Sequence, residues 1–241
     1  SLEMHLGERR PALKPQAEAA AVIHLDTPVL NEAELAAISQ QGLPVATLST
    51  QVAVEACAGG LSSALDALCQ AAEEAVRGGA QVLVLSDRVD SAGAAAPLTA
   101  TSVAMPPLLS VGAVHHHLLR QKLRLRCSLV VDTAQCWSTH HMACLIGYGA
   151  SAVCPWLTWE TTRHWLAHPK TQKRIEQGKL PPLDAEKVQA NVRVSLENGL
   201  RKILSKIGIS LLASYHGAQI FEAIGLCLLY TSDAADEGLG V

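Results

Sequence analysis

Short apolar runs alternate with longer amphipathic stretches along most of this chain. The runs at 45–48, 80–85, 127–131 and 152–154 are rich in Val, Leu, Ala and Cys, which is typical of strands buried on both faces. Between them, apolar residues recur every three or four positions, as on one face of a helix. This order predicts right-handed crossovers and a mainly parallel sheet. About five strands are too few for a closed eight-stranded barrel, so we expect an α/β fold, an incomplete (β/α)-barrel-like domain with flanking helices.

Local signals mark where the helices begin and end. Asn31 followed by Glu34 has the form of a capping box. Gly59-Gly60 precedes a helix predicted over 61–77, and Pro106-Pro107 opens a helix that ends near Gln121. Further helices are predicted over 139–146, 184–198 and 199–207.

Three segments are expected to lie outside regular elements. Residues 1–21 are charged and then Ala-rich, and we interpret most of them as an extended lead-in rather than a packed element. Residues 91–105 form an Ala/Ser/Thr-rich loop, and residues 167–184 form a polar excursion.

Residues 202–226 are the most informative stretch. A helix ends at Gly208, and 209–213 is predicted to be a strand buried on both faces. Ser214, Tyr215 and His216 would then lie at the carboxyl end of that strand, where ligands and partner surfaces gather in parallel sheets. The alternative is that these side chains only close a loop before a further helix over 218–226.

Two other polar pairs follow predicted strands. Asp87-Arg88 comes after 80–85, and Asp132-Thr133 comes after 127–131. They form either an ion pair with turn caps or the wall of a site or channel.

Composition narrows the classes of partner and compartment. The formal net charge is −3, which argues against a nucleic-acid partner. No apolar run approaches the roughly 18 residues needed to cross a bilayer, so we expect no membrane partner. The first residue is Ser1 rather than Met, which is consistent with a fragment. The seven cysteines form no CxxC pair, which indicates reduced thiols in a cytoplasmic type of compartment.

Other candidate chemistry is weak. The histidines at 115–117 and at 140–141 are adjacent in sequence, so their side chains diverge on a helix, and we expect no metal site. Residues 147–152 match GxGxxA, but they end a predicted helix and lead into a strand, the reverse of a dinucleotide site. Trp156, Trp159 and Trp165 are expected to pack an interface rather than stack on a ligand.

Several stretches resemble the central domain of glutamate synthase, especially the ferredoxin-dependent type. They are SLEMHLGERRP at 1–11, GGAQVLVLSDR at 78–88, LLSVGAVHHHLL at 108–119, HHMACLIGYGASAV at 140–153, and residues 202–226. The last includes SYHGAQIFEAIGL and is the most specific. The resemblance covers nearly all of residues 1–226, which we identify as one domain.

The resemblance implies a piece of a large oxidoreductase. In that family an amidotransferase domain releases ammonia from glutamine, and an FMN domain with a [3Fe–4S] cluster makes glutamate from 2-oxoglutarate, with ferredoxin as electron donor. The central domain joins them and helps to wall the ammonia tunnel, so neither cofactor nor any catalytic residue is expected in this piece. The residues that we expect to line the tunnel or to face neighbouring domains are Asp87, Arg88, His116, His140, His141, Lys206, Ser214, Tyr215, His216 and Gln219.

This chain also departs from the family pattern. The 91–105 loop is longer, and Asp132 and Cys154 stand in runs that differ from the usual ones, which leaves their hydrogen-bond roles open. Residues 227–241 look like translated sequencing adaptor, and we predict that they are not natural sequence and do not pack. The resemblance implies a cytoplasmic enzyme, or a plastid one in a photosynthetic eukaryote. The alternatives are a stand-alone barrel-like enzyme that binds FMN or phosphate, and a pure scaffold.

Overall fold

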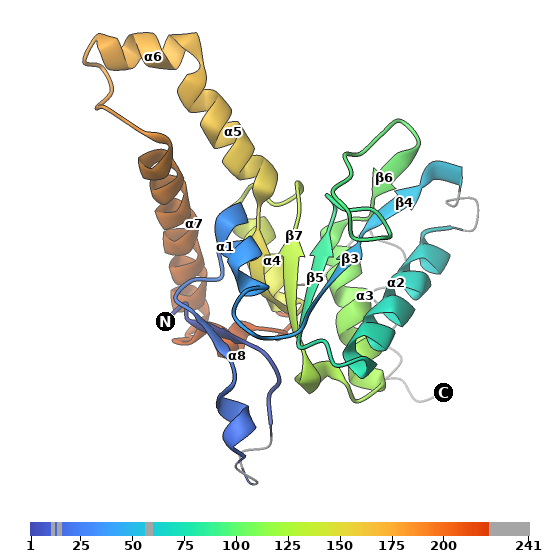
Figure 1. The fold of residues 1–241 in the computed structure, drawn as a ribbon. Coiled ribbons are helices and arrows are strands. Elements are labelled where there is room, and N and C mark those ends of the chain that lie inside the picture. Colours follow the sequence, from blue (N-terminus) through green and yellow to red (C-terminus); the bar gives the residue numbers. More distant parts are fainter. Residues whose placement is uncertain (11–12, 14–15, 56–59, 222–241) are drawn as a thin grey trace.

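A parallel sheet of four strands, in the order β3-β5-β7-β8, forms the centre of the molecule. The computed structural model describes residues 1–10, 13, 16–55 and 60–221 (Figure 1). The strands lie side by side in the order in which they occur along the chain, as in part of a (β/α) barrel, and the predicted fold class is confirmed. Their bounds are β3 (Val45–Ser49), β5 (Val82–Ser86), β7 (Ser128–Asp132) and β8 (Ala150–Cys154).

Helices connect successive strands and pack against one another in sequence. α2 (Gly60–Arg77) packs against α3 (Pro107–Arg120), α3 packs against α4 (Thr139–Gly147), and α4 packs against α7 (Ala185–Ile207). The sheet is extended beyond β8 by a parallel bridge at Val29, where Leu30 N donates to Val153 O at 2.9 Å. α1 (Glu32–Ile38) follows this bridge and lies in front of the sheet in Figure 1.

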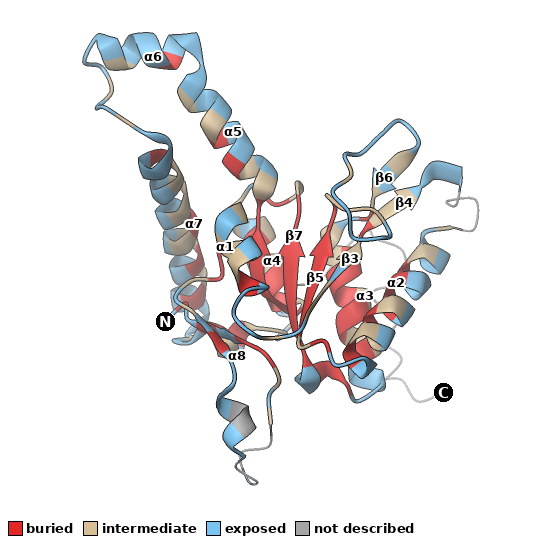
Figure 2. Ribbon diagram, viewed as in Figure 1, coloured by how far each residue is buried: buried red, intermediate tan, exposed pale blue. Residues whose placement is uncertain are grey.

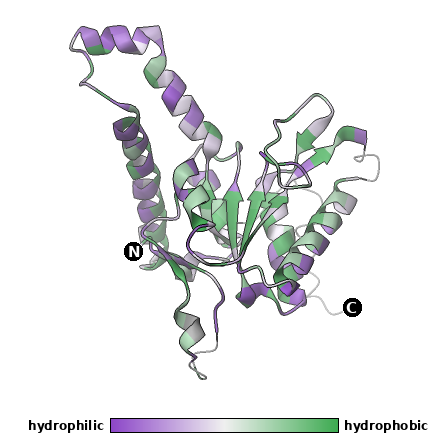
Figure 3. Cartoon of the chain, in the orientation of Figure 1, coloured by the Kyte–Doolittle hydropathy of each residue, from purple (hydrophilic) through white to green (hydrophobic). Residues whose placement is uncertain are grey.

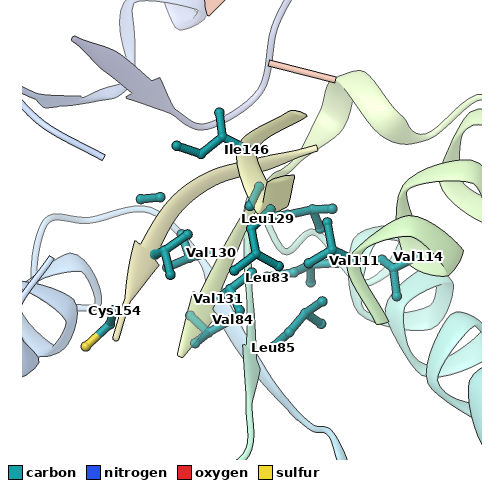
Figure 4. Close-up of a cluster of buried hydrophobic side chains, with 14 of the residues drawn as sticks. Leu83, Val84, Leu85, Val111, Val114, Leu129, Val130, Val131, Ile146 and Cys154 are labelled. Carbon is teal, nitrogen blue, oxygen red and sulfur yellow. The ribbon is translucent and has the colours of Figure 1, made fainter. Parts of the chain in front are cut away.

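The core is densest around the middle strands. Every residue of β5, β7 and β8 is buried, so both faces of the sheet are covered (Figure 2). Leu83, Leu129 and Val111 are among the side chains that meet there (Figure 4). The strands stand out as apolar when the chain is coloured by hydropathy (Figure 3). Burying each such side chain contributes about 1.5–3 kcal/mol, which explains the near-continuous apolar runs in the sequence.

The predicted local signals are confirmed. Glu34 N donates to Asn31 Oδ1 and Asn31 N donates to Glu34 Oε2, both at 2.8 Å, which completes the capping box of α1. Gly208 adopts φ +74° at the end of α7, a conformation that favours glycine. The GxGxxA run ends α4 and leads into β8, as the sequence indicated.

The beginning of the chain differs from the prediction. β1 (Met4–Leu6) pairs antiparallel with β2 (Ile23–Leu25), so the first residues are packed rather than an extended lead-in. Leu2, Met4 and Leu6 are buried while the residues between them are exposed. This strict alternation has the period of a strand, a signal that the charged residues after it obscured.

Two segments predicted without regular structure contain some. The 91–105 segment includes β6 (Ser102–Ala104), which pairs antiparallel with β4 (Gln51–Ala53). The 167–184 segment includes α6 (Pro169–Glu176), which lies between α5 (Trp156–Ala167) and α7. Two further short elements are the 3-10 helices η1 (Ala17–Ala20) and η3 (Arg124–Arg126).

The helices predicted over 184–198 and 199–207 are one helix, α7. Gly199 lies in its interior, where a Cβ would stand 2.3 Å from Thr139 Oγ1 at the start of α4. The glycine therefore marks a close approach of two helices and not a helix end.

The strand predicted over 209–213 is absent. Ser210 and Leu211 are exposed, Leu212 N donates to Ser1 O at 3.0 Å, and α8 (Leu212–Tyr215) begins there. A short apolar run fits a strand or a helix equally well, and this one hydrogen-bonds to Ser1, which lies outside the named strands. Residues 218–221 are not helical, and the rest of the helix predicted over 218–226, together with the tail at 227–241, lies outside the described residues.

Candidate functional site

Polar side chains at the C-terminal ends of the parallel strands, here called the carboxyl edge of the sheet, form a network of mutual hydrogen bonds. Arg88 binds Asp132 through two hydrogen bonds, Nη2 to Oδ1 at 2.7 Å and Nε to Oδ2 at 3.0 Å. Ser86 Oγ donates to the same Oδ2 at 2.7 Å. This two-point pairing is the strongest geometry available to an arginine and a carboxylate.

Asp87 is buried beside this pair, and its carboxylate is also fully engaged. Thr133 Oγ1 and Ala134 N both donate to Oδ2 at 2.8 Å, and Trp156 Nε1 donates to Oδ1 at 2.6 Å. The guanidinium carbon of Arg88 lies 5.4 Å from the Trp156 ring centre, a cation–π contact. The prediction of an ion pair with turn caps at these strand ends matches this geometry.

The surroundings at the carboxyl edge keep Arg88 charged and the Cys154 thiol neutral. Burial is the largest single influence on the pKa of Arg88 and lowers it, but the hydrogen bonds to Asp132 and the nearby negative charges, chiefly that of Asp132, together raise the pKa above its usual value. Burial, together with the charge of Asp132, raises the pKa of the Cys154 thiol far above neutral pH. Each oxygen of the two aspartates therefore already accepts from a protein donor, and the Cys154 thiol stays protonated at neutral pH.

This edge does not fit the phosphate of a flavin. The guanidinium of Arg88 is already held by Asp132, and the buried carboxylate of Asp87 lies beside it. A phosphate would have to displace Asp132 and approach a second anion, which is unfavourable.

A second polar cluster surrounds the buried Arg124 at the opposite end of the sheet. The N-terminal ends of the parallel strands lie there, and we call this end the amino edge. Its Nε donates to His115 Nδ1 at 2.9 Å, its Nη1 to Cys127 O at 2.7 Å, and its Nη2 to Gly149 O at 2.8 Å. His216 Nε2 donates to the same Gly149 O at 2.8 Å. Every partner found for Arg124 in the described part of the chain is neutral.

The two histidines of this cluster are held neutral. Burial, and then the charge of Arg124, lowers the pKa of His115 to about 3 and that of His216 to about 4. Neutral His115 accepts from Arg124 while neutral His216 donates to a carbonyl, so both tautomers follow from the hydrogen bonds. Their pKa values are too low for a general base near pH 7.

The segment 214–219 is hydrogen-bonded to the C-terminal part of α4. Tyr215 is buried and its hydroxyl donates to Ala143 O at 3.0 Å. Gly217 N donates to Ile146 O at 3.1 Å, and Gln219 N donates to Gly147 O at 3.0 Å. These hydrogen bonds hold the segment against α4 at the amino edge.

The predicted position of Ser214, Tyr215 and His216 was therefore wrong. They do not follow a strand, and they lie at the amino edge, about 16 Å along a five-residue strand from Asp87 at the carboxyl edge. In parallel sheets the two edges face opposite directions, so one small site cannot include both groups.

The other candidates are distributed between these edges and the surface. His116 Nε2 and Gln219 Nε2 are 2.6 Å apart, so His116 belongs to the cluster at the amino edge. His140 and His141 lie in the first turn of α4, where His141 contacts Trp137 and His140 lies beside Cys144. Lys206 and Ser214 are exposed.

Sequence reasoning missed Arg124, Trp137 and the role of His115. Arg124 stands in a run of basic residues that reads as solvated surface, and only the fold buries it. Of the tryptophans assigned to an interface, Trp159 is fully buried and donates to Leu30 O at 2.8 Å, and Trp156 binds Asp87. Of these three tryptophans, only Trp165 is substantially exposed.

The described cysteines lack the features of reactive or metal-bound thiols. Burial raises the pKa of Cys69 and Cys127 to about 11 and that of Cys136 to about 12, so these thiols stay protonated at neutral pH. Within the described ranges, no three His, Cys, Asp or Glu side chains gather in a way that could hold a metal ion. Within the same ranges, no helix is long and apolar enough to cross a membrane.

Comparison with known proteins gives one consistent family. The sequence model of the glutamate synthase central domain matches residues 1–227. The chain is 55% identical over 226 residues to ferredoxin-dependent glutamate synthase 2 of Synechocystis, and 49% identical over 232 residues to the chloroplastic ferredoxin-dependent glutamate synthase of Spinacia oleracea. Each alignment covers 94% of this chain and 14% of the relative, so the chain spans about one seventh of these relatives' length.

Solved structures give a weaker likeness. The flavin-binding domain of baker's yeast flavocytochrome b2 superposes with a TM-score of 0.46 at 11% identity, covering 88% of this chain and 45% of that one.

Proposed function

Because the chain belongs to the glutamate synthase central-domain family, we propose that it connects the domain that releases ammonia from glutamine to the domain that builds glutamate. In this role the chain also walls part of the path along which ammonia passes. FMN, the [3Fe–4S] cluster and the contact with ferredoxin belong to other parts of the polypeptide. The enzyme resides in the cytoplasm, or in the plastid stroma of a photosynthetic eukaryote.

The closed network at the carboxyl edge is the observation that supports this role best. In barrel enzymes this edge carries the catalytic residues. Here each oxygen of Asp87 and Asp132 accepts from a protein donor, and Arg88 donates two hydrogen bonds to Asp132. A barrel-like domain whose active-site edge is occupied by its own side chains is suited to holding other domains in position.

The same observation predicts that the isolated 241-residue chain is inactive. It should neither hydrolyse glutamine nor reduce 2-oxoglutarate with ammonia, and it should not quench FMN fluorescence on titration. A stand-alone FMN enzyme predicts quenching and a yellow complex. Quenching that saturates near one FMN per chain would contradict our proposal.

The ammonia path is tested in the full-length enzyme by adding bulk at each edge. Ser214→Trp changes an exposed residue at the amino edge, and Ser91→Trp changes an exposed residue near Arg88 at the carboxyl edge. Gln41→Trp, at an exposed position in the turn that follows α1, is the matched control. We measure glutamate synthesis with glutamine and, separately, with ammonia.

We expect one edge variant to lower the glutamine-dependent rate at least five-fold while the ammonia-dependent rate and the control stay unchanged. Two edge variants that leave both rates as in the parent enzyme would exclude an ammonia path at these edges. Equal loss of both rates in each variant would also contradict it, because that pattern reports general damage.

A further inference from the structure

An apolar groove with a volume of about 840 Å³ lies between α5 and α7. Leu157 and Trp165 from α5, Val188 and Val192 from α7, and Trp137 from the loop before α4 are among its lining residues. Trp137, Trp165 and Leu157 are 66%, 43% and 40% exposed. Clustered exposed tryptophans are typical of protein interfaces, where Trp contributes strongly to binding.

The walls of the groove are held in place by contacts outside it. Trp159 anchors α5 to Leu30, and an ion pair between Arg193 and Glu34 fastens α7 to α1. Arg163 binds Glu32 at 2.7 Å and ties α5 to the same helix. The opening therefore does not require the two helices to separate.

The chemistry of the lining favours a polypeptide over a small polar ligand. None of the residues that line the groove is charged. Two of its hydroxyls are already used, since Thr158 donates to Cys136 O and Thr162 donates to Thr158 O. A groove between two helices with apolar walls matches the way an amphipathic helix is recognised by its apolar side chains.

A cationic segment lies in the chain between two of the lining residues, since α6 follows Trp165 and precedes Leu183. α6 joins α5 to the loop before α7 and is largely hydrophilic (Figures 1 and 3). Lys170, Lys173 and Arg174 on this helix, with Lys179 just after it, are exposed. No carboxylate in the described part of the chain pairs with any of these four side chains. An occupant with acidic residues near α6 would neutralise them.

We infer that this groove binds an apolar helix with acidic residues at its α6-facing end, contributed by another domain of the same polypeptide. The inference deepens the proposed linking role and rests on it. The relatives are about seven times longer than the aligned segment, so most of their polypeptide is available to supply the helix. An exposed pair of tryptophans on a linking domain is explained if a neighbouring domain covers them.

The test uses hydroxyl-radical footprinting of the full-length enzyme with mass spectrometry. Trp137 and Trp165 should be oxidised at least five-fold more slowly than free tryptophan side chains of the same exposure. Leu125, which is 62% exposed far from the groove, should react at the rate its exposure predicts. Full reactivity of both tryptophans overturns the inference.

A second measurement identifies the occupant. Zero-length carbodiimide cross-linking should join Lys173 or Lys179 to an acidic residue of another domain within one polypeptide. Trp165→Glu, which places a charge in the groove, should reduce this cross-link at least five-fold, while the matched control Leu125→Glu should leave it unchanged. Cross-links only between isotopically distinct copies would overturn the inference in favour of self-association.

These results are separable from those of the proposed function. If the tryptophans react at full rate while Ser214→Trp or Ser91→Trp lowers only the glutamine-dependent rate, the inference about the groove is wrong and the ammonia path stands. If the tryptophans are protected while neither variant changes the glutamine-dependent rate, the ammonia path is wrong and the inference about the groove stands.

Discussion

Acidification should destabilise this chain through two buried histidines. Burial lowers the pKa of His115 to about 3 and that of His216 to about 4, with the charge of Arg124 as the next cause. The other charged or titratable groups that bear on them are His116 and Arg9, which are also basic. Protonating either histidine would thus place a second positive charge beside Arg124, whose described partners are all neutral.

The sign and size of the effect follow from proton linkage. Above pH about 6.5 the histidines are neutral in both the folded and the unfolded chain, so they add no pH dependence. Below it the unfolded chain binds protons that the folded chain does not, and stability falls as the pH drops toward the folded pKa values. At pH 4.5 the limit is about 2.7 kcal/mol per histidine. Since His216 is partly exposed, we expect a combined loss of about 3–4 kcal/mol.

Urea unfolding of the chain at pH 7.0, 5.5 and 4.5 measures this loss directly. His216→Asn retains a donor for Gly149 O but no longer titrates, so its stability should fall less steeply with acid than that of the parent chain. His164→Asn changes an exposed histidine and is the matched control, expected to follow the parent. Equal slopes for the parent chain and His216→Asn would refute the reasoning.

Two substitutions test the clusters at the sheet edges. Asp132→Asn leaves the partly exposed Arg88 without its carboxylate and should lower the free energy of unfolding by about 2–3 kcal/mol, with partial recovery in the double variant that adds Arg88→Met. Gly149→Ala would put a Cβ 2.3 Å from His115 Nδ1 at a backbone φ of +119°, and should cost about 3 kcal/mol or more. Gly42→Ala, at φ +85° with open space around it, should cost only about 1 kcal/mol. Urea unfolding measures each, and a Gly149→Ala cost no larger than that of Gly42→Ala would show that the overlap with His115 is relieved at no cost.

Signals that act over a few residues were read correctly from the sequence. The capping box at Asn31 and the αL glycine at Gly208 depend on hydrogen bonds between near neighbours, and both are present. The apolar runs before Asp87 and Asp132 became adjacent parallel strands because their side chains can be buried only inside a covered sheet.

Only the tertiary structure decided which end of the sheet each candidate would reach. Whether residues 209–213 formed a strand depended on a strand partner far away in sequence, and Ser210 and Leu212 instead hydrogen-bond to Ser1 at the start of the chain. That choice places His216 at the amino edge, beside an arginine whose burial no local pattern marks. Chain order alone determined the alternation of strands and helices, whereas long-range packing determined the two separate polar edges, because burial and hydrogen-bond partners come from residues far apart in sequence.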